Sequence, residues 1–268
     1  EQTSRLVNDV LIGNFGLSEK DLMIVFSGGR GYHVHVRTPD VLTLPSGARR
    51  EIADYLTGKG LDLNKILIDA GYTKEYPIRG RGLERKNIPF SKLPKNDSKG
   101  WQGIISKFIN YKLDNLRDIE KEERDTEIKK IGIPKDGLNL KMKNEDAFNK
   151  LPEFSKKKFV RFALKETAIH PDEPVTGDIH RLIRLPGSLH GKTGLIVKTL
   201  NRKELDKFDP YEIPIAFSNN PVKIRNVVGR PITMGNNYKV GKDEVIELPE
   251  FVAIYFMAMK FATLCLET

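Results

Sequence analysis

The spacing of apolar side chains predicts a helix followed by a strand hairpin at the start of the chain. Residues 3–15 repeat apolar side chains at three- and four-residue intervals, as an amphipathic helix does. Residues 22–26 (LMIVF) form a short apolar run, and residues 32–36 (YHVHV) alternate between the two faces of a strand. The glycine-rich run at 27–31 (SGGRG) joins them, so we expect a tight turn there. Residues 46–58 begin with serine and end with glycine, which predicts a capped helix.

The middle of the chain is polar and mostly helical in period. Residues 62–71 fit a helix or a strand equally well. The basic, glycine-containing run at 77–85 is expected to be a loop, with contact to nucleic acid as the alternative. We interpret residues 86–152 as a largely helical insertion with one thin apolar stripe, against which Trp101 is expected to pack.

The last part of the chain predicts one more basic helix, several strands and a final helix. Residues 154–167 have amphipathic spacing and a leading run of three lysines, 156–158, whose side chains are either solvated or in contact with a DNA backbone. An apolar strand begins at Leu195. Further short strands are expected at 222–228, 232–234 and 245–248, before a mostly apolar helix at 251–266.

Composition and charge favour an intracellular protein with a polyanionic partner. The 268 residues are 39% hydrophobic and 30% charged, with a net charge of +9, which favours nucleic acid or nucleotide phosphates. Cys265 is the single cysteine, so an intrachain disulfide and a cysteine-based zinc cluster are both excluded. The absence of a long apolar run predicts no membrane-spanning helix, and we expect no membrane partner.

Residues 172–195 (DEPVTGDIHRLIRLPGSLHGKTGL) concentrate groups suited to phosphate and metal binding around one Pro-Gly turn. Cations gathered at a turn bind phosphates, and a carboxylate upstream can hold a divalent metal. The alternative is a solvated hairpin with ordinary surface charges. The groups concerned are Asp172, Asp178, His180, Arg181, Arg184, Ser188, His190 and Lys192.

The predicted hairpin at 22–36 is a second candidate for phosphate binding. Its glycines let the backbone approach a ligand closely, while Ser27 offers a hydroxyl and Arg30 a planar set of donors. His33 and His35 share one strand face. The alternative is a surface hairpin whose histidines face solvent.

The two motifs together resemble those of the catalytic small subunit of archaeal and eukaryotic DNA primase. The resemblance rests on a Ser-Gly-x-Arg-Gly-x-His pattern from Ser27 and on an Arg-Leu-Ile-Arg-x-Pro-x-Ser-Leu-His-Gly-Lys pattern from Arg181. It implies an α/β (α+β) fold in which a mixed sheet is flanked by helices. It also implies template-directed nucleotidyl transfer with two divalent metals, Mg²⁺ or Mn²⁺.

The resemblance assigns roles to individual residues. Asp172 is expected to be a metal ligand and a catalytic carboxylate, and Asp178 to orient a basic neighbour. The expected ligands of the nucleotide triphosphate are Ser27, Arg30, His33, Arg181, Arg184, His190 and Lys192. Gly29 stands where some family members carry a second basic residue, so one cation is expected to be missing.

Two features of the family are not found in these 268 residues. No Asp-x-Asp pair, which supplies the family's other two metal ligands, occurs in the sequence. We expect that the chain shown lacks an N-terminal part that carries it, the alternative being an inactive relative. The family's zinc-binding knob is also excluded by the single cysteine.

These observations predict a primase catalytic subunit that makes short primers on single-stranded DNA. Its expected partners are a large regulatory subunit, the template, an RNA or DNA primer, and NTPs or dNTPs. The expected domains are a catalytic core (1–85 and 153–248), the helical insertion (86–152) and a C-terminal helix (249–268). The alternatives are a primase-like polymerase of end joining and an inactive nucleotide- or DNA-binding module of the same fold.

Overall fold

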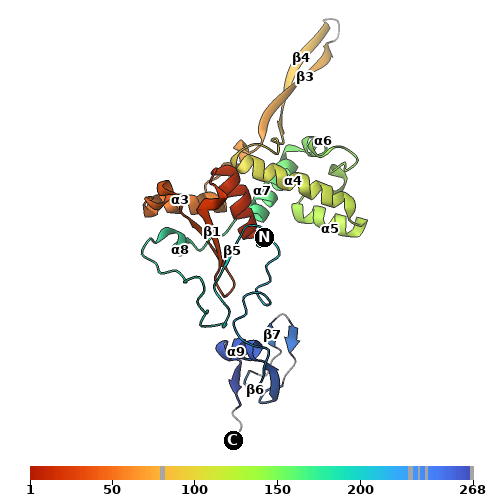
Figure 1. Ribbon diagram of the computed structural model, residues 1–268. Helices are drawn as coiled ribbons and strands as arrows, with labels where there is room; N and C mark the ends of the chain where they lie inside the picture. The colour runs from red at the N-terminus through yellow and green to blue at the C-terminus, as the bar shows by residue number, and fades with distance from the viewer. Residues whose placement is uncertain (79–81, 229–231, 235, 239–240, 266–268) are drawn as a thin grey trace. The chain divides into compact units, whose positions relative to one another are not determined.

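The computed structural model describes residues 1–78, 82–228, 232–234, 236–238 and 241–265 (Figure 1). The chain divides into two compact units. The first unit comprises residues 1–12, 16–45 and 178–268, and the second unit comprises residues 13–15 and 46–177.

Helices and antiparallel sheets are both present, so the predicted mixed α/β (α+β) class is confirmed. The helices are α1 (Gln2–Arg5), which continues as a π-helix at Leu6–Asn14, α2 (Pro39–Leu42), α3 (Ser46–Thr57), α4 (Gly100–Asp118), α5 (Lys121–Ile131), α6 (Asn144–Asn149), α7 (Glu153–Thr167), α8 (Glu173–Gly177) and α9 (Glu250–Ala258). Short 3₁₀ turns occur at Glu19–Asp21, Leu63–Lys65 and Lys135–Gly137. The strands are β1 (Leu22–Phe26), β2 (Tyr32–Val36), β3 (Ile68–Ile78), β4 (Gly82–Lys92), β5 (Lys198–Leu200), β6 (Pro221–Asn226), β7 (Ile232–Met234), β8 (Asn236–Tyr238), β9 (Val245–Pro249) and β10 (Ala262–Leu264).

The first unit contains a three-stranded antiparallel sheet in the order β2-β1-β5. The predicted hairpin is confirmed: Phe26 pairs with Tyr32, and the five residues between 26 and 32 make the turn. Ile24 and Phe26 are buried in the core of this unit, which explains why an apolar run forms the central strand. The strand expected from Leu195 begins later, since β5 starts at Lys198 and Ile196 makes only an isolated bridge.

A second antiparallel sheet of the first unit, in the order β10-β6-β9, contradicts part of the predicted C-terminal helix. Helix α9 ends at Ala258, and the chain turns through Lys260, whose φ is 62°. Residues 262–264 then pair with β6 instead of continuing the helix. The apolar run from 251 to 264 therefore covers both a helix and a strand, which composition alone does not separate.

The second unit has a helical core formed mainly by α4 and α7, as their spacing predicts. Helix α4 buries Ile105, Ile109 and Leu113 at four-residue intervals. Trp101 is packed as expected, and its Nε1 donates a hydrogen bond to the Tyr55 carbonyl at 3.0 Å.

Strands β3 and β4 of the second unit form a long hairpin in place of the loop expected at 77–85. The strands pair in register from Ile68–Lys92 to Ile78–Gly82. Most side chains of both faces are exposed, so no apolar face marks these strands in the sequence. Residues 79–81, which are part of the predicted basic loop, lie outside the described residues.

Contacts at the root of this hairpin explain why one lysine of the 156–158 run is buried, although the sequence groups it with solvated lysines. Lys156 of α7 is fully buried instead of facing solvent. Its Nζ donates to the Ser91 carbonyl at 2.6 Å and to Glu153 Oε1 at 2.8 Å. Because Glu153 Oε1 also accepts the Ser91 N–H at 3.1 Å, the buried charge is paired and the edge of β4 is held.

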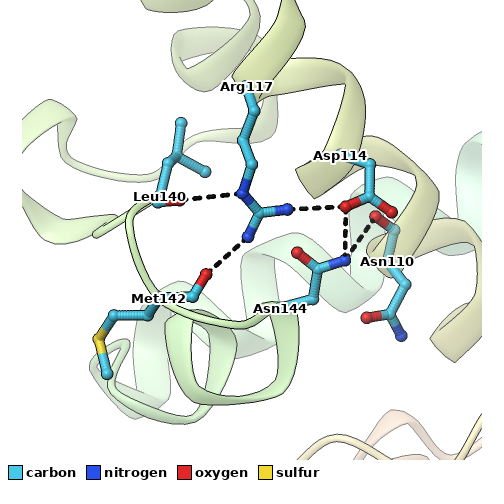
Figure 2. A network of polar contacts seen from close by, with 6 residues as sticks. All are labelled: Asn110, Asp114, Arg117, Leu140, Met142 and Asn144. Carbon is cyan, nitrogen blue, oxygen red and sulfur yellow. Dashed lines mark hydrogen bonds and ion pairs between the residues drawn. The ribbon is translucent and has the colours of Figure 1, made fainter.

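Arg117 of α4 fixes the loop that precedes α6 (Figure 2). Its Nε and Nη2 donate to the carbonyls of Leu140 and Met142 at 2.9 and 2.7 Å. Its Nη1 donates to Asp114 Oδ1 at 2.7 Å, and the same oxygen accepts the Asn144 amide at 2.9 Å. One planar guanidinium therefore satisfies two loop carbonyls and a carboxylate together.

Replacing Arg117 by lysine is expected to lower the free energy of unfolding by ~1–3 kcal/mol, because an ammonium cannot reach both carbonyls and the carboxylate. Urea denaturation measures the loss. The control is Arg161→Lys on the exposed side of α7, which should change stability by less than about 0.5 kcal/mol. Equal midpoints for the two variants would contradict the role given to Arg117.

Candidate nucleotide-binding site

The turn of the first hairpin is compact and glycine-dependent. Ser27 is buried, and its N–H donates to the Gly31 carbonyl at 2.9 Å, which closes the turn. Gly28 has a φ of +76°, in the left-handed region that glycine adopts without strain. Arg30 is exposed at the tip of the turn. The turn thus presents a serine, glycine backbone and a cation in a short space.

The second motif folds into another hairpin of the first unit. The N–H of Gly187 donates to the Val197 carbonyl at 2.7 Å, and the N–H of Val197 donates to the Ser188 carbonyl at 2.8 Å. At the tip, the His190 N–H donates to the Leu195 carbonyl at 2.8 Å. The Pro-Gly turn expected here is therefore one part of a hairpin whose tip lies between 190 and 195.

The tips of the two hairpins lie against each other. The Thr193 hydroxyl donates to the Gly28 carbonyl. Arg184 Nη1 donates to the Ser27 carbonyl at 3.3 Å. We call the residues Ser27–Gly31 and Arg184–Leu195 the paired tips, since these contacts join segments that are 157 or more residues apart in the sequence.

Two of the three glycines of the first tip make room for His190. A Cβ built on Gly28 would lie 2.6 Å from the His190 Cβ and 3.1 Å from the Leu195 carbonyl oxygen. A Cβ built on Gly29 would lie 3.2 Å from His190 Nε2. A basic residue at position 29 would therefore compete with the imidazole for the same space, which gives a physical reason for glycine there.

His190 is buried and has neighbours that keep it neutral. Burial lowers the pKa of His190 below its ordinary value, and the cations Arg184 and Lys192 lower this pKa further. Two groups contact His190 Nδ1: the Lys192 N–H at 3.3 Å and the Thr193 hydroxyl at 3.0 Å. The other ring nitrogen, Nε2, lies on the side that faces Gly29.

Four of the other predicted phosphate ligands are exposed, whereas Ser27 is buried and His33 is half-buried. Arg181, Arg184 and Lys192 are exposed along the second motif. His33 lies on β2 beside His35, with ring centroids 6.2 Å apart. Burial lowers the pKa of His35, and the nearby His33 and Arg37 lower it further.

The acidic residues of the second motif have local structural roles. Asp172 belongs to the second unit, where its carbonyl and its Oδ1 accept the Val175 N–H at 3.1 and 3.3 Å and so cap α8. Asp178 Oδ1 accepts the His180 N–H at 2.9 Å, a local turn contact to a backbone group instead of a basic side chain.

Thr193 is a site residue that the motif analysis did not single out. Its hydroxyl joins the two tips, lies 3.0 Å from His190 Nδ1, and accepts the Leu195 N–H at 3.3 Å. A threonine between lysine and glycine in a turn is a weak signal, because its partner is a backbone carbonyl 165 residues away.

Comparison with known proteins identifies the family. The family model for the DNA primase small subunit matches residues 1–202, which include both hairpins. The chain belongs to the DNA primase small subunit family. The resemblance inferred from the two motifs is therefore confirmed.

Several archaeal proteins named DNA primase small subunit PriS are similar to this family member over most of its length. The protein of Methanococcoides burtonii is 38% identical over 262 residues, which cover 93% of this chain and 65% of that protein. The protein of Methanothrix thermoacetophila is 36% identical over 97% of this chain and 69% of that protein. The protein of Thermoplasma acidophilum is 31% identical over 96% of this chain and 64% of that protein. The chain thus spans about two thirds of the length of these primase subunits.

Two structural features are absent from the described residues of this family member. Within them, no group of three or more His, Cys, Asp or Glu side chains is arranged to hold a metal ion. None of the described helices is long and apolar enough to cross a membrane.

Substituting Gly28 by alanine is expected to destabilise the protein more than the same change at Gly16. Both residues have positive φ, 76° and 71°, so both variants lose ~1–2 kcal/mol to backbone strain. A Cβ at position 16 meets nothing within 4 Å, whereas one at 28 meets His190 Cβ at 2.6 Å. The extra loss at 28 should be ~1–3 kcal/mol in urea denaturation, and equal losses would contradict the packing of the tips.

The lowered pKa of His190 predicts a pH-dependent stability. Because the unfolded state keeps the ordinary value of 6.5, it binds more protons than the folded state just below that pH. The free energy of unfolding should therefore fall as pH drops through about 6.5. The difference between the wild type and His190→Asn, measured by urea denaturation from about pH 8 to 5, isolates this contribution. A difference independent of pH would contradict a neutral His190.

Proposed function

We propose that the paired tips bind the triphosphate of an incoming nucleotide in a nucleotidyltransferase that makes primers on single-stranded DNA. The observation that carries this proposal is the contact between the tips: Arg184 and His190 of one motif lie on the Ser27–Gly29 turn of the other. Membership of the primase small subunit family supports the reaction class.

The proposed roles follow from the chemistry of each side chain. Arg30, Arg181, Arg184 and Lys192 would neutralise the phosphates, and arginine in particular pairs with two phosphate oxygens at once. His190 would contact the phosphates through Nε2, and His33 and the Ser27 hydroxyl would complete the ligand set. Because Arg184 and His190 are held by backbone contacts before a nucleotide arrives, these two groups need little reorganisation to stabilise developing charge.

The carboxylate ligands that the reaction needs for divalent metals are less completely defined than the phosphate ligands. Two divalent ions require several oxygen ligands, and the described residues do not gather such a set. Asp172 is exposed in the second unit, and its role as a carboxylate ligand for Mg²⁺ or Mn²⁺ stays a prediction that the proposed site does not include. The roles of the paired tips therefore concern the triphosphate alone.

The proposed partners are those of a primase. The relatives are named small subunits, which supports a heterodimer with a large regulatory subunit. The net charge of +9 supports binding of a single-stranded template and an RNA or DNA primer. NTPs or dNTPs would be the substrates.

Replacing Arg184 by alanine is expected to lower nucleotide incorporation on a single-stranded template by about 100- to 1,000-fold, the scale of losing one preorganised donor. Incorporation should be measured with the full-length protein and its large subunit. The control is Lys203→Ala, at an exposed position of the first unit that has no role in the proposal.

Three outcomes are informative. Unchanged incorporation by Arg184→Ala would contradict the proposed site. Synthesis without a primer supports a primase, whereas synthesis that requires a primer favours the polymerase of end joining. Nucleotide binding without turnover in the wild type would favour a binding module.

A further inference from the structure

The hairpin of β3 and β4 has no role in the proposed triphosphate site. Its two eleven-residue strands form a sheet of their own, and Figure 1 shows it as a ribbon attached at one end to the helices of the second unit. An isolated two-stranded ribbon is only marginally stable in water. The presence of such a ribbon, with most of its side chains exposed, therefore requires an explanation.

The two faces of the hairpin differ in chemistry. Cross-strand partners share a face, so the register defines both sets. One set, which we call the aromatic face, consists of Ala70, Tyr72, Lys74 and Tyr76 with Glu84, Lys86, Ile88 and Phe90. On the opposite face, Glu75 pairs with Arg85 at 2.8 Å, which neutralises both charges there.

The aromatic face holds an unfavourable charge pair. Lys74 lies directly opposite Lys86 in the ladder, and both are exposed. Like charges at such positions are destabilising. Both ammonium groups lie over the Tyr76 ring, 5.2 and 5.8 Å from its centroid, and Lys86 Nζ also lies 3.4 Å from Glu84 Oε2. Because the Lys86–Glu84 ion pair is exposed, it offsets only part of the repulsion. An anion bound between the two lysines would remove the rest.

Aromatic rings lie beside this cationic pair. Tyr72 is 52% exposed, and its ring contacts Phe90 with centroids 6.0 Å apart. Tyr76 is half-buried under the lysines. Rings and cations alternate along β3, as bases and phosphates alternate along a single strand of nucleic acid.

The root of the hairpin is fixed to the helices of its unit. Lys156 and Glu153 hold Ser91, as described above, and the Leu93 N–H donates to Asn149 Oδ1 at 3.0 Å. Because the root is already ordered, less conformational entropy of the hairpin is lost when a ligand binds.

We propose that the aromatic face binds single-stranded nucleic acid, with a base stacked on Tyr72 and phosphates at Lys74 and Lys86. Duplex nucleic acid fits less well because its base faces are covered by stacking. The proposal rests on the proposed function only in that a single strand is the template. The triphosphate site and this face use different residues and can fail separately.

The test is fluorescence anisotropy of a labelled single-stranded oligothymidylate, titrated with the full chain in the absence of nucleotides. Tyr72→Ala should weaken binding by about 5- to 100-fold, as loss of one stacked base does. Tyr72→Phe, which keeps the ring, should bind like the wild type. Because the conservative variant occupies the same position in the strand, it separates stacking from misfolding of the hairpin.

The double variant Lys74→Ala/Lys86→Ala tests the phosphate contacts. It should weaken binding and reduce the salt dependence of log K by about 1.4, which corresponds to two phosphates of a single strand. The charge-matched control is Lys107→Ala/Lys121→Ala, at exposed positions of α4 and α5. The double variant Lys74→Arg/Lys86→Arg should retain the wild-type salt dependence.

Several results would overturn the proposal. Affinity of the alanine variants equal to that of the charge-matched control would do so, as would equal competition by duplex DNA. Equal competition by polyglutamate would show instead a surface for an acidic protein. Arg184→Ala should bind the oligonucleotide normally while failing to incorporate nucleotide, so loss of one activity leaves the other proposal standing.

Discussion

The close approach of His190 to the Gly28–Gly29 backbone is the constraint on which the candidate site depends. Without a Cβ at either glycine, the imidazole fits against the turn and the Thr193 hydroxyl reaches the Gly28 carbonyl. Arg184 then reaches the Ser27 carbonyl. The cations of one motif and the backbone of the other are thereby brought to one surface, although neither hairpin alone would hold them in register.

The parts of the fold that could be predicted are those with buried apolar side chains. Strand β1 is a short apolar run that is buried on both faces, and helices α4 and α7 have apolar side chains at helical spacing, so the sequence shows them. The β3–β4 hairpin lacks a buried face along most of its length, so its central part, residues 77–85, was expected to be a loop and residues 86–92 were assigned to the helical insertion. Lys156 was misplaced for a related reason, since its burial depends on Glu153 and on a carbonyl of β4.

The candidate site was predictable in its residue types but not in its contacts. Spacing and charge identify Arg184 and His190, and the family model covers both motifs. The groups that hold them are mostly backbone carbonyls and N–H groups, which every residue has and which a sequence therefore cannot single out. Thr193 was missed because its partner is such a carbonyl.

The prolines of the β3–β4 hairpin affect how the protein behaves at high concentration. Cross-strand pairs alternate between those whose N–H groups bond to the partner strand and those whose N–H groups point away from it. Pro77 and Pro89 both lie in pairs of the second kind. Each proline removes a donor from an outer edge, and the next outward N–H on β4, that of Ser91, is bound by Glu153. A strand from another molecule therefore meets an interrupted row of donors, which discourages aggregation through the edges of the ribbon.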